Sequence, residues 1–197
     1  MTFKLGLTGS IGMGKSTTAQ MFVEEGCAHW DADAAVHRLY ANGGAAVGPI
    51  AASFPTAIED GAVSRERLKD IISADRGALR KIEKIVHPLV ARDRQEFLQN
   101  TTDDVCVLDI PLLFETGGDQ AMDAVVCVTV SPQLQRERVL SRGTMTETQF
   151  DAIREKQLPD EIKRDRADYV IETDTLEHAR EQVQAVLAEI RKNISHA

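Results

Sequence analysis

The stretch GSIGMGKS, residues 9–16, restricts the fold of this chain more than any other feature of its sequence. A short and mostly apolar run, residues 3–8, precedes it, and residues 17–23 fit the start of an amphipathic helix. The order Gly-x4-Gly-Lys-Ser matches the phosphate-binding loop without a mismatch. Because glycines let successive backbone N–H groups point inward at a helix N-terminus, the stretch predicts a pocket for a phosphate chain.

Each residue type in this loop fits a contact with a nucleotide. The Lys15 ammonium suits the β- and γ-phosphates, and the Ser16 hydroxyl is a candidate ligand for Mg²⁺. The nucleotide-binding residues expected in the loop are Gly12, Met13, Gly14, Lys15, Ser16 and Thr17. A chance glycine-rich turn is the alternative, and the strand before and the helix after argue against it. A dinucleotide-binding loop is excluded because the third glycine of that fingerprint is missing.

Further apolar runs predict that the loop belongs to a parallel sheet. Residues 104–109, 124–130 and 168–172 have the pattern of buried strands, and residues 27–30 have a weaker one. Helical patterns lie between them, and this alternation is typical of a parallel sheet covered on both faces. The predicted fold class is α/β, a three-layer P-loop NTPase fold with a parallel five-stranded sheet.

The alternation of strands and helices lapses between residues 34 and 100. Helical patterns there predict an inserted helical part, residues 34–100. Residues 143–165 are charged and predict a lid of two short helices joined at Pro159, while residues 177–192 predict a closing helix. The nucleotide-binding part of this single domain is then residues 1–33, 101–142 and 166–197. The helices expected in the insertion span residues 34–40, 65–72, 79–86 and 89–98.

Two carboxylates follow predicted strands on the side where the phosphate-binding loop lies. Asp109 ends a buried strand, a position that suits a Mg²⁺ partner, and the alternative is a turn aspartate at a strand end. Asp33 belongs to the stretch Asp31-Ala32-Asp33 after the second strand, and one of its carboxylates is a candidate to reach an acceptor hydroxyl. Helix capping by Asp31 or Asp33 remains the alternative. A calcium loop is excluded because Val36 stands where that loop requires glycine.

Three arginines, Arg136, Arg138 and Arg142, fall on the helix expected after the fourth strand. Arg138 and Arg142 are one turn apart, so they share a helix face. Arginines there suit the phosphates of ATP and the charge of a transition state, and a solvated helix face is the alternative.

Composition excludes several functional classes. The formal net charge of −8 argues against broad binding to a nucleic-acid backbone. No apolar run is long enough for a membrane span or a signal peptide, so we expect a cytoplasmic protein without a membrane partner. The cysteines are odd in number and are expected to be buried, reduced thiols: Cys27, Cys106 and Cys127. The histidines show no metal-binding spacing.

In its motifs the chain resembles the dephospho-CoA kinases, which use ATP to phosphorylate the ribose 3'-hydroxyl in the last step of coenzyme A synthesis. The resemblance runs nearly end to end. Its most specific parts are Asp31-Ala32-Asp33, His87-Pro88 and the run Asp109-Ile110-Pro111-Leu112-Leu113-Phe114-Glu115. The other positions that carry it are residues 6–17, Gln135, Arg138, Arg142, Gln157, Lys163 and residues 167–171.

The resemblance implies a role for several residues. Asp33 would act as general base or orienter for the 3'-hydroxyl, Lys15 and Arg142 would clamp the transferring phosphoryl, and Ser16 with Asp109 would serve Mg²⁺. The inserted helical part, residues 34–100, would bind the acceptor, with His87 among its substrate-binding residues. A structural role for His87-Pro88 stays open, with the proline starting a helix. The implied partners are ATP and dephospho-CoA, and we expect a monomer or a weak homo-oligomer.

The chain departs from the family pattern at three places. Glu172-Thr173 stands where asparagine is usual near the adenine, Ser64 replaces an aspartate and Ser73 replaces a phenylalanine. Two other functions stay in competition. Another small-molecule kinase of this fold would prefer a different acceptor, and a GTPase switch would need a base-reading motif, of which Ile162-Lys163-Arg164-Asp165 has the wrong first residue.

Overall fold

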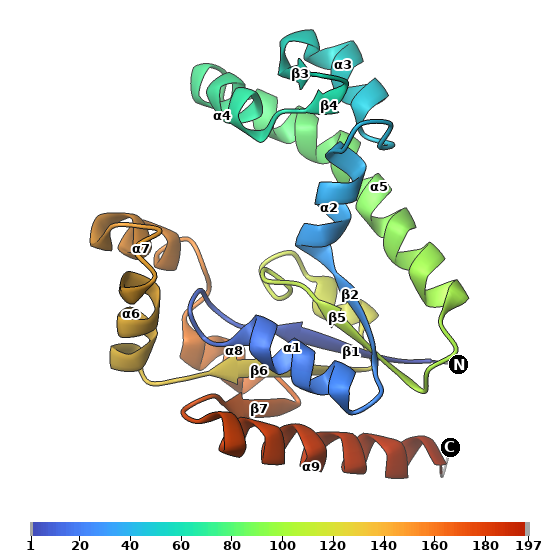
Figure 1. The fold of residues 1–197 in the computed structure, drawn as a ribbon, viewed down its shortest axis with the longest axis vertical. Helices are drawn as coiled ribbons and strands as arrows, with labels where there is room; N and C mark the ends of the chain where they lie inside the picture. The colour runs from blue at the N-terminus through green and yellow to red at the C-terminus, as the bar shows by residue number, and fades with distance from the viewer. Residues whose placement is uncertain (1, 196–197) are drawn as a thin grey trace. The chain divides into compact units, whose positions relative to one another are not determined.

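A five-stranded parallel sheet forms the centre of the fold, with the strand order β2-β5-β1-β6-β7. The computed structural model describes residues 2–195, which divide into two units. We call residues 2–30 with 101–195 the sheet unit and residues 31–100 the helical unit (Figure 1). The strands are β1 (Phe3–Thr8), β2 (Ala28–Asp31), β5 (Val105–Asp109), β6 (Ala124–Thr129) and β7 (Tyr169–Glu172).

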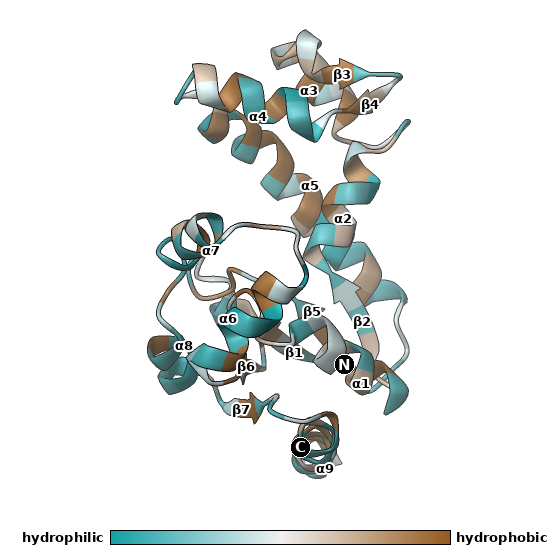
Figure 2. Cartoon of the chain, turned by 60° about the vertical axis from the view of Figure 1, so that its left-hand side comes forward, coloured by the Kyte–Doolittle hydropathy of each residue, from teal (hydrophilic) through white to brown (hydrophobic). Residues whose placement is uncertain are grey.

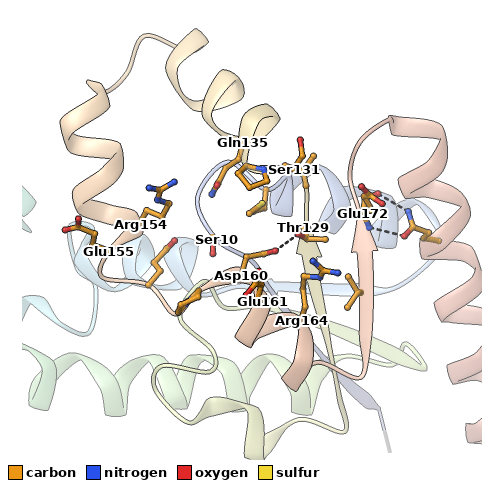
Figure 3. A pocket seen from close by; sticks show the side chains of 17 residues that line it. Ser10, Thr129, Ser131, Gln135, Arg154, Glu155, Asp160, Glu161, Arg164 and Glu172 are labelled. Atoms are coloured by element: carbon orange, nitrogen blue, oxygen red, sulfur yellow. Dashed lines mark hydrogen bonds between the residues drawn. The ribbon is translucent and has the colours of Figure 1, made fainter.

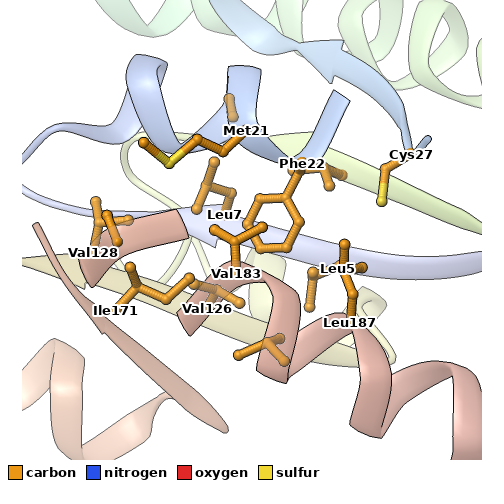
Figure 4. Packing of buried hydrophobic residues seen from close by; sticks show 14 of the residues in the cluster. Leu5, Leu7, Met21, Phe22, Cys27, Val126, Val128, Ile171, Val183 and Leu187 are labelled. Atoms are coloured by element: carbon orange, nitrogen blue, oxygen red, sulfur yellow. The ribbon is translucent and has the colours of Figure 1, made fainter. Parts of the chain in front are cut away.

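The sheet follows the predicted strands closely, because the middle strands are buried on both faces. Every residue of β5 and β6 is buried, which explains their continuous apolar runs. On one face, Phe22 of α1 (Lys15–Glu24) and Val183 of α9 (Leu176–Ser195) join the core of the sheet (Figure 4). On the other face, Val125 joins a cluster with Leu113. The predicted α/β fold with helices on both faces is confirmed.

Three further helices of the sheet unit lie along the chain between β6 and β7. They are α6 (Pro132–Ser141), α7 (Glu147–Arg154) and α8 (Asp160–Arg166). Pro159 is the N-cap of α8, so the two short helices expected between residues 143 and 165 are present and are joined at this proline. A short 3-10 helix, Gly118–Ala121, precedes β6.

The helical unit has its own small core. It contains α2 (Ala32–Tyr40), α3 (Val47–Ser53), α4 (Arg65–Ala74) and α5 (Ala78–Asn100), with a short 3-10 helix, Pro55–Ala57. Figure 2 shows hydrophobic and hydrophilic residues alternating along α4 and α5, as expected of helices that bury one face. The buried residues of this core are Leu39, Ala46, Ile50, Ala57, Val63, Leu68, Ile82 and Val86.

One expectation for this unit is wrong. Two helices were predicted at residues 79–86 and 89–98, with Pro88 starting the second, but α5 is a single helix with Pro88 inside it. A proline in a helix interior costs about 3 kcal/mol, because it removes a backbone hydrogen bond and crowds the preceding turn. The burial of Ile82 and Val86 at helical spacing supplies the packing that offsets this cost.

A β-hairpin in the helical unit was not predicted. Strands β3 (Ile58–Glu59) and β4 (Ala62–Val63) pair antiparallel around Asp60 and Gly61, whose φ angles are 49° and 77°. Two central residues with positive φ define the turn that suits a two-residue hairpin, and Asp-Gly is a preferred pair for it.

Burial has the expected effect on the cysteines. All three are free and buried, as predicted. Desolvation raises the pKa of Cys27 to about 11 and those of Cys106 and Cys127 to about 12. Among residues 2–195, no helix is both long and apolar enough to cross a membrane.

Candidate active site

The phosphate-binding loop ends where α1 begins, and this junction leaves backbone donors available. Gly14 is the N-cap of α1 in a left-handed conformation, and no side chain caps the helix. The first turn carries no acidic residue, and Ser16 and Thr17 are exposed. A helix N-terminus with free N–H groups and no competing carboxylate attracts an anion.

Two glycines of the loop are required by their surroundings. Gly12 has a φ of 79°, and a Cβ placed there would lie 2.4 Å from Cγ2 of Val139. Gly14 has a φ of 90°, and a Cβ there would lie 2.9 Å from Oγ1 of Thr173. Both the positive φ and the close neighbours exclude a side chain, so the motif glycines shape the loop as predicted.

Lys15 and Asp109 form an ion pair at the mouth of the loop. Asp109 ends β5 and is 1% exposed, and the Lys15 ammonium donates a hydrogen bond to its Oδ1. Nε2 of His29, on β2, lies 3.9 Å from Oδ2 of the same carboxylate and makes no hydrogen bond to any described residue. The structure therefore joins two predicted site residues and adds His29, whose place two residues before Asp31 was the only sequence signal.

Two glutamine side chains form hydrogen bonds to the backbone of one residue of the phosphate-binding loop, Ile11. Nε2 of Gln135, on α6, donates to the Ile11 carbonyl at 2.7 Å, and the Ile11 N–H donates to Oε1 of Gln157 at 3.2 Å. Gln135 is 3% exposed, so its side chain is fixed by its surroundings. The Met13 N–H donates within the loop, to the Ser10 carbonyl at 3.2 Å. Sequence analysis marked both glutamines as family positions but gave them no role.

Thr173 connects the loop to Arg138. Its hydroxyl donates to the Met13 carbonyl at 2.8 Å, and Nη1 of Arg138 donates to that hydroxyl at 3.0 Å. Nη2 of Arg138 also donates to the Thr173 carbonyl at 2.5 Å. The hydroxyl is therefore occupied by the loop and the arginine.

The three arginines have different surroundings. Arg138 is held by Thr173, while Arg136 forms an ion pair with Glu147 of α7. Arg142 is the C-cap of α6 and is exposed. A pocket of about 300 Å³ lies between the start of α1 and the two arginines Arg138 and Arg142. Its lining also includes Gly14, Thr17, Thr173 and Leu176.

A larger cavity of about 770 Å³ lies beside the ends of β6 and β7. Figure 3 shows Ser10 and Gln135 on its walls, together with Asp160 and Arg164 of α8. The Thr129 hydroxyl donates to Oδ2 of Asp160 at 2.6 Å, which ties α8 to the end of β6.

Glu115 and Lys163 form a second buried pair. Lys163 is 0% exposed, and its Nζ lies 2.9 Å from Oε1 of Glu115, which also accepts the Leu158 N–H at 2.9 Å. Burial alone would raise the pKa of the Glu115 carboxyl, but the hydrogen bonds from Lys163 and Leu158 outweigh it and hold that pKa below its usual value. The pair joins the loop after β5 to α8.

The remaining predicted residues lie in the helical unit. Asp31 is the N-cap of α2, since its Oδ1 accepts the Ala34 N–H at 2.7 Å, so the capping role falls to Asp31 and not to Asp33. Asp33 is exposed in the first turn of α2, and His87 is exposed on α5. Neither side chain has a hydrogen bond or ion pair within residues 2–195.

A family model and proteins similar in sequence and structure lead to the same family. The dephospho-CoA kinase family model matches residues 3–178. A dephospho-CoA kinase of Ruegeria pomeroyi is 65% identical over 197 residues, which covers 100% of both chains. A crystal structure of a Thermus thermophilus protein aligns with a TM-score of 0.85 and 32% identity, covering 95% of this chain and 97% of that one. The Campylobacter jejuni dephospho-CoA kinase shares the fold, with a TM-score of 0.71, 23% identity and coverage of 98% and 99%.

Proposed function

The chain belongs to the dephospho-CoA kinase family, and on this premise we propose which of its residues carry out phosphoryl transfer. As a member of that family it uses ATP to phosphorylate the ribose 3'-hydroxyl of dephospho-CoA, giving coenzyme A and ADP. Such transfer passes through a loose transition state, which proteins stabilise by positioning and by positive charge. The roles below distribute these two tasks between the two units.

Lys15 and the amides at the start of α1 bind the β- and γ-phosphates of ATP. The free helix N-terminus and the glycine-shaped loop support this role. The Lys15 ammonium donates a hydrogen bond to Asp109. When ATP binds, Lys15 transfers its hydrogen bond to a phosphate oxygen, which leaves the buried carboxylate available.

The donor set around the loop fits a magnesium ion. Asp109 supplies a carboxylate at the end of β5 and Ser16 supplies an exposed hydroxyl, and Mg²⁺ prefers such oxygen ligands. When bound, the ion would neutralise charge on the phosphates. The described residues contribute the ligands and the surrounding positive charge.

The pocket between Gly14 and Arg138 is our candidate for the ATP base and ribose. It borders the phosphate-binding loop and has a volume of about 300 Å³. Arg138 is fixed on its wall by Thr173, whereas Arg142 is exposed and free to turn toward the transferring phosphoryl. Met13 shapes this side of the loop through its carbonyl, which accepts from Thr173.

Asp33 is the acceptor-side group in this proposal. It orients the ribose 3'-hydroxyl and accepts its proton during transfer, while His87 contributes to binding dephospho-CoA. Support comes from the exposure of both side chains and from the separate capping role of Asp31. We assign residues 34–100 to acceptor binding and residues 143–165 to a lid that excludes water.

The single observation that carries the proposal is the Lys15–Asp109 pair beside an uncapped helix N-terminus. A coupled assay with ATP, Mg²⁺ and dephospho-CoA measures ADP and coenzyme A directly. We expect acceptor-dependent ADP formation, and little turnover when a nucleoside monophosphate replaces dephospho-CoA or GTP replaces ATP. A preference for the monophosphate acceptor would contradict the assignment.

We also propose that the protein works in the cytoplasm as a monomer or weak homo-oligomer. The three free, buried thiols suit a reducing compartment. Sedimentation velocity across a hundredfold concentration range tests the second point, because a stable dimer at the lowest concentration would contradict it.

A further inference from the structure

The segment from Gln157 to Lys163 is fixed by several contacts to other parts of the sheet unit. The Leu158 N–H donates to Glu115 at 2.9 Å, Asp160 accepts from Thr129 at 2.6 Å, and the fully buried Lys163 pairs with Glu115 at 2.9 Å. Residues 143–156, just before it, are mostly exposed. A fixed segment next to an exposed one is the arrangement expected at the base of a moving element.

The contacts of this segment lead to the two loops that carry the phosphate chemistry. Gln157 binds Ile11, which lies in the same loop as Lys15. Glu115 lies in the loop that follows Asp109. The base of the proposed lid is therefore hydrogen-bonded to the loops of both members of the Lys15–Asp109 pair.

Gln157 is the first fixed residue after the exposed segment, and its partner group is not needed by the nucleotide. Ile11 precedes the loop positions assigned to phosphate binding, so its N–H remains available to a protein acceptor. Its carbonyl is held by Gln135, which is 3% exposed. A shift of the lid at Gln157 therefore acts on a loop residue whose carbonyl is already held by Gln135.

We propose that Gln157 is a positioning residue that couples the exposed part of the lid, residues 143–156, to the phosphate-binding loop through the Ile11 N–H. The inference rests on the lid assignment made above and adds a specific contact to it. With the contact intact, closing of the lid and the phosphate-binding shape of the loop stabilise each other. Without it, the loop still binds ATP, but the closed lid is less populated, so water competes with the ribose hydroxyl for the γ-phosphoryl group.

The test compares two glutamines that both bind backbone groups. Gln157→Met removes the acceptor oxygen at similar length, and Gln157→Glu retains an acceptor. The control is Gln182→Met, because the hydrogen bonds of the Gln182 side chain go to the backbone of Glu172 and His178 and, among the described residues, none goes to the phosphate-binding loop. The measured quantity is the ratio of ATP hydrolysis without transfer to coenzyme A formation, which a purely structural loss does not change.

We expect Gln157→Met to raise this ratio about five- to tenfold, the effect of losing one hydrogen bond that favours the closed state. Gln157→Glu should return it to within about twofold of the wild type, and Gln182→Met should leave it unchanged. Should Gln157→Met fail to fold, Gln157→Ser provides the same measurement. An unchanged ratio in the Gln157 variant, or an equal rise in the Gln182 variant, overturns the proposal.

Limited proteolysis of residues 143–156 separates this inference from the lid assignment. If those residues form a lid, MgATP with dephospho-CoA protects the wild type from cleavage there, and Gln157→Met reduces the protection. If the wild type gains no protection, the lid assignment fails. Protection that is equal in wild type and variant leaves the lid in place and contradicts the role of Gln157.

Discussion

The sheet unit and the helical unit present their functional groups in opposite ways. In the sheet unit, Lys15 is held by Asp109 and Arg138 by Thr173. In the helical unit, Asp33 and His87 are exposed and have no hydrogen bond or ion pair to the residues that the structure describes. The difference teaches that a site for a polyanion is built in advance from restrained donors, whereas the acceptor groups receive their partners from the substrate.

The largest expected effect comes from removing the Lys15 ammonium of the sheet unit. Lys15→Ala should lower kcat/KM by about 10³-fold or more, because the transferring phosphoryl group loses the positive charge that Lys15 places beside it. The matched control is Lys4→Ala, because the Lys4 side chain is 36% exposed and its ammonium pairs with Asp123. Turnover by Lys15→Ala within tenfold of wild type would contradict the assignment.

The acceptor side should respond differently. Asp33→Asn should lower turnover by about 10²- to 10³-fold, because the ribose hydroxyl loses its base and orienter. Its melting temperature should stay at the wild-type value, since Asp33 makes no hydrogen bond or ion pair with the described chain. Asp70→Asn, an exposed aspartate on α4, is the control. A large loss of stability in Asp33→Asn would break the comparison between the units.

Glu115→Gln should affect stability more than any exposed carboxylate of the helical unit. It leaves Lys163 buried without its counter-charge, which costs about 3 kcal/mol in free energy of unfolding. Glu59→Gln, in an exposed pair with Arg67, should cost less than about 1 kcal/mol. Chemical denaturation of both variants at pH 7 measures the difference, and equal costs would contradict the restrained character of the sheet unit.

The same pair predicts a dependence on pH. The pKa of Glu115 is lowered from its ordinary 4.5, so its stabilising contribution is fully present above that value. It is lost as the pH falls through the lower, folded-state pKa. The gap in unfolding free energy between wild type and Glu115→Gln should therefore be constant from pH 7 to 5 and narrow below 4.5. A gap that widens in acid would contradict the sign of this shift.

His87 should give the smallest effect. His87→Ala should raise KM for dephospho-CoA by about tenfold or less and leave KM for ATP unchanged, because one exposed contact to the substrate is lost. Steady-state kinetics with each substrate varied in turn measures both constants. A change in melting temperature without a change in KM would assign the histidine to structure.

Local patterns were sufficient for the parts of the site that lie within one motif. The strand before the phosphate-binding loop, the glycines within it and the carboxylate at the end of β5 all have short-range signatures. The contacts between Gln157 and Ile11 and between Thr173 and Met13 have none, because they join residues more than 140 positions apart. Thr173 was considered only for the nucleotide base, yet its hydroxyl binds the loop and Arg138.

Other differences come from competition between local and tertiary preferences. Pro88 indicates a helix start when taken alone, but α5 continues through it, with the buried Ile82 and Val86 before it and the partly buried Leu89 and Val90 after it. Asp60-Gly61 carries a hairpin signal, and the strands it joins are too short to show any alternation of their own. Both belong to the helical unit, whose small core depends on packing between separated segments.

The most direct test of the central claim is a calorimetric titration of MgATP into wild type, Lys15→Ala and Asp33→Asn without acceptor. A nucleotide site complete within the sheet unit predicts that Asp33→Asn keeps the wild-type Kd within about twofold and that Lys15→Ala raises it about tenfold or more. Weakened binding in Asp33→Asn together with unchanged binding in Lys15→Ala would contradict it.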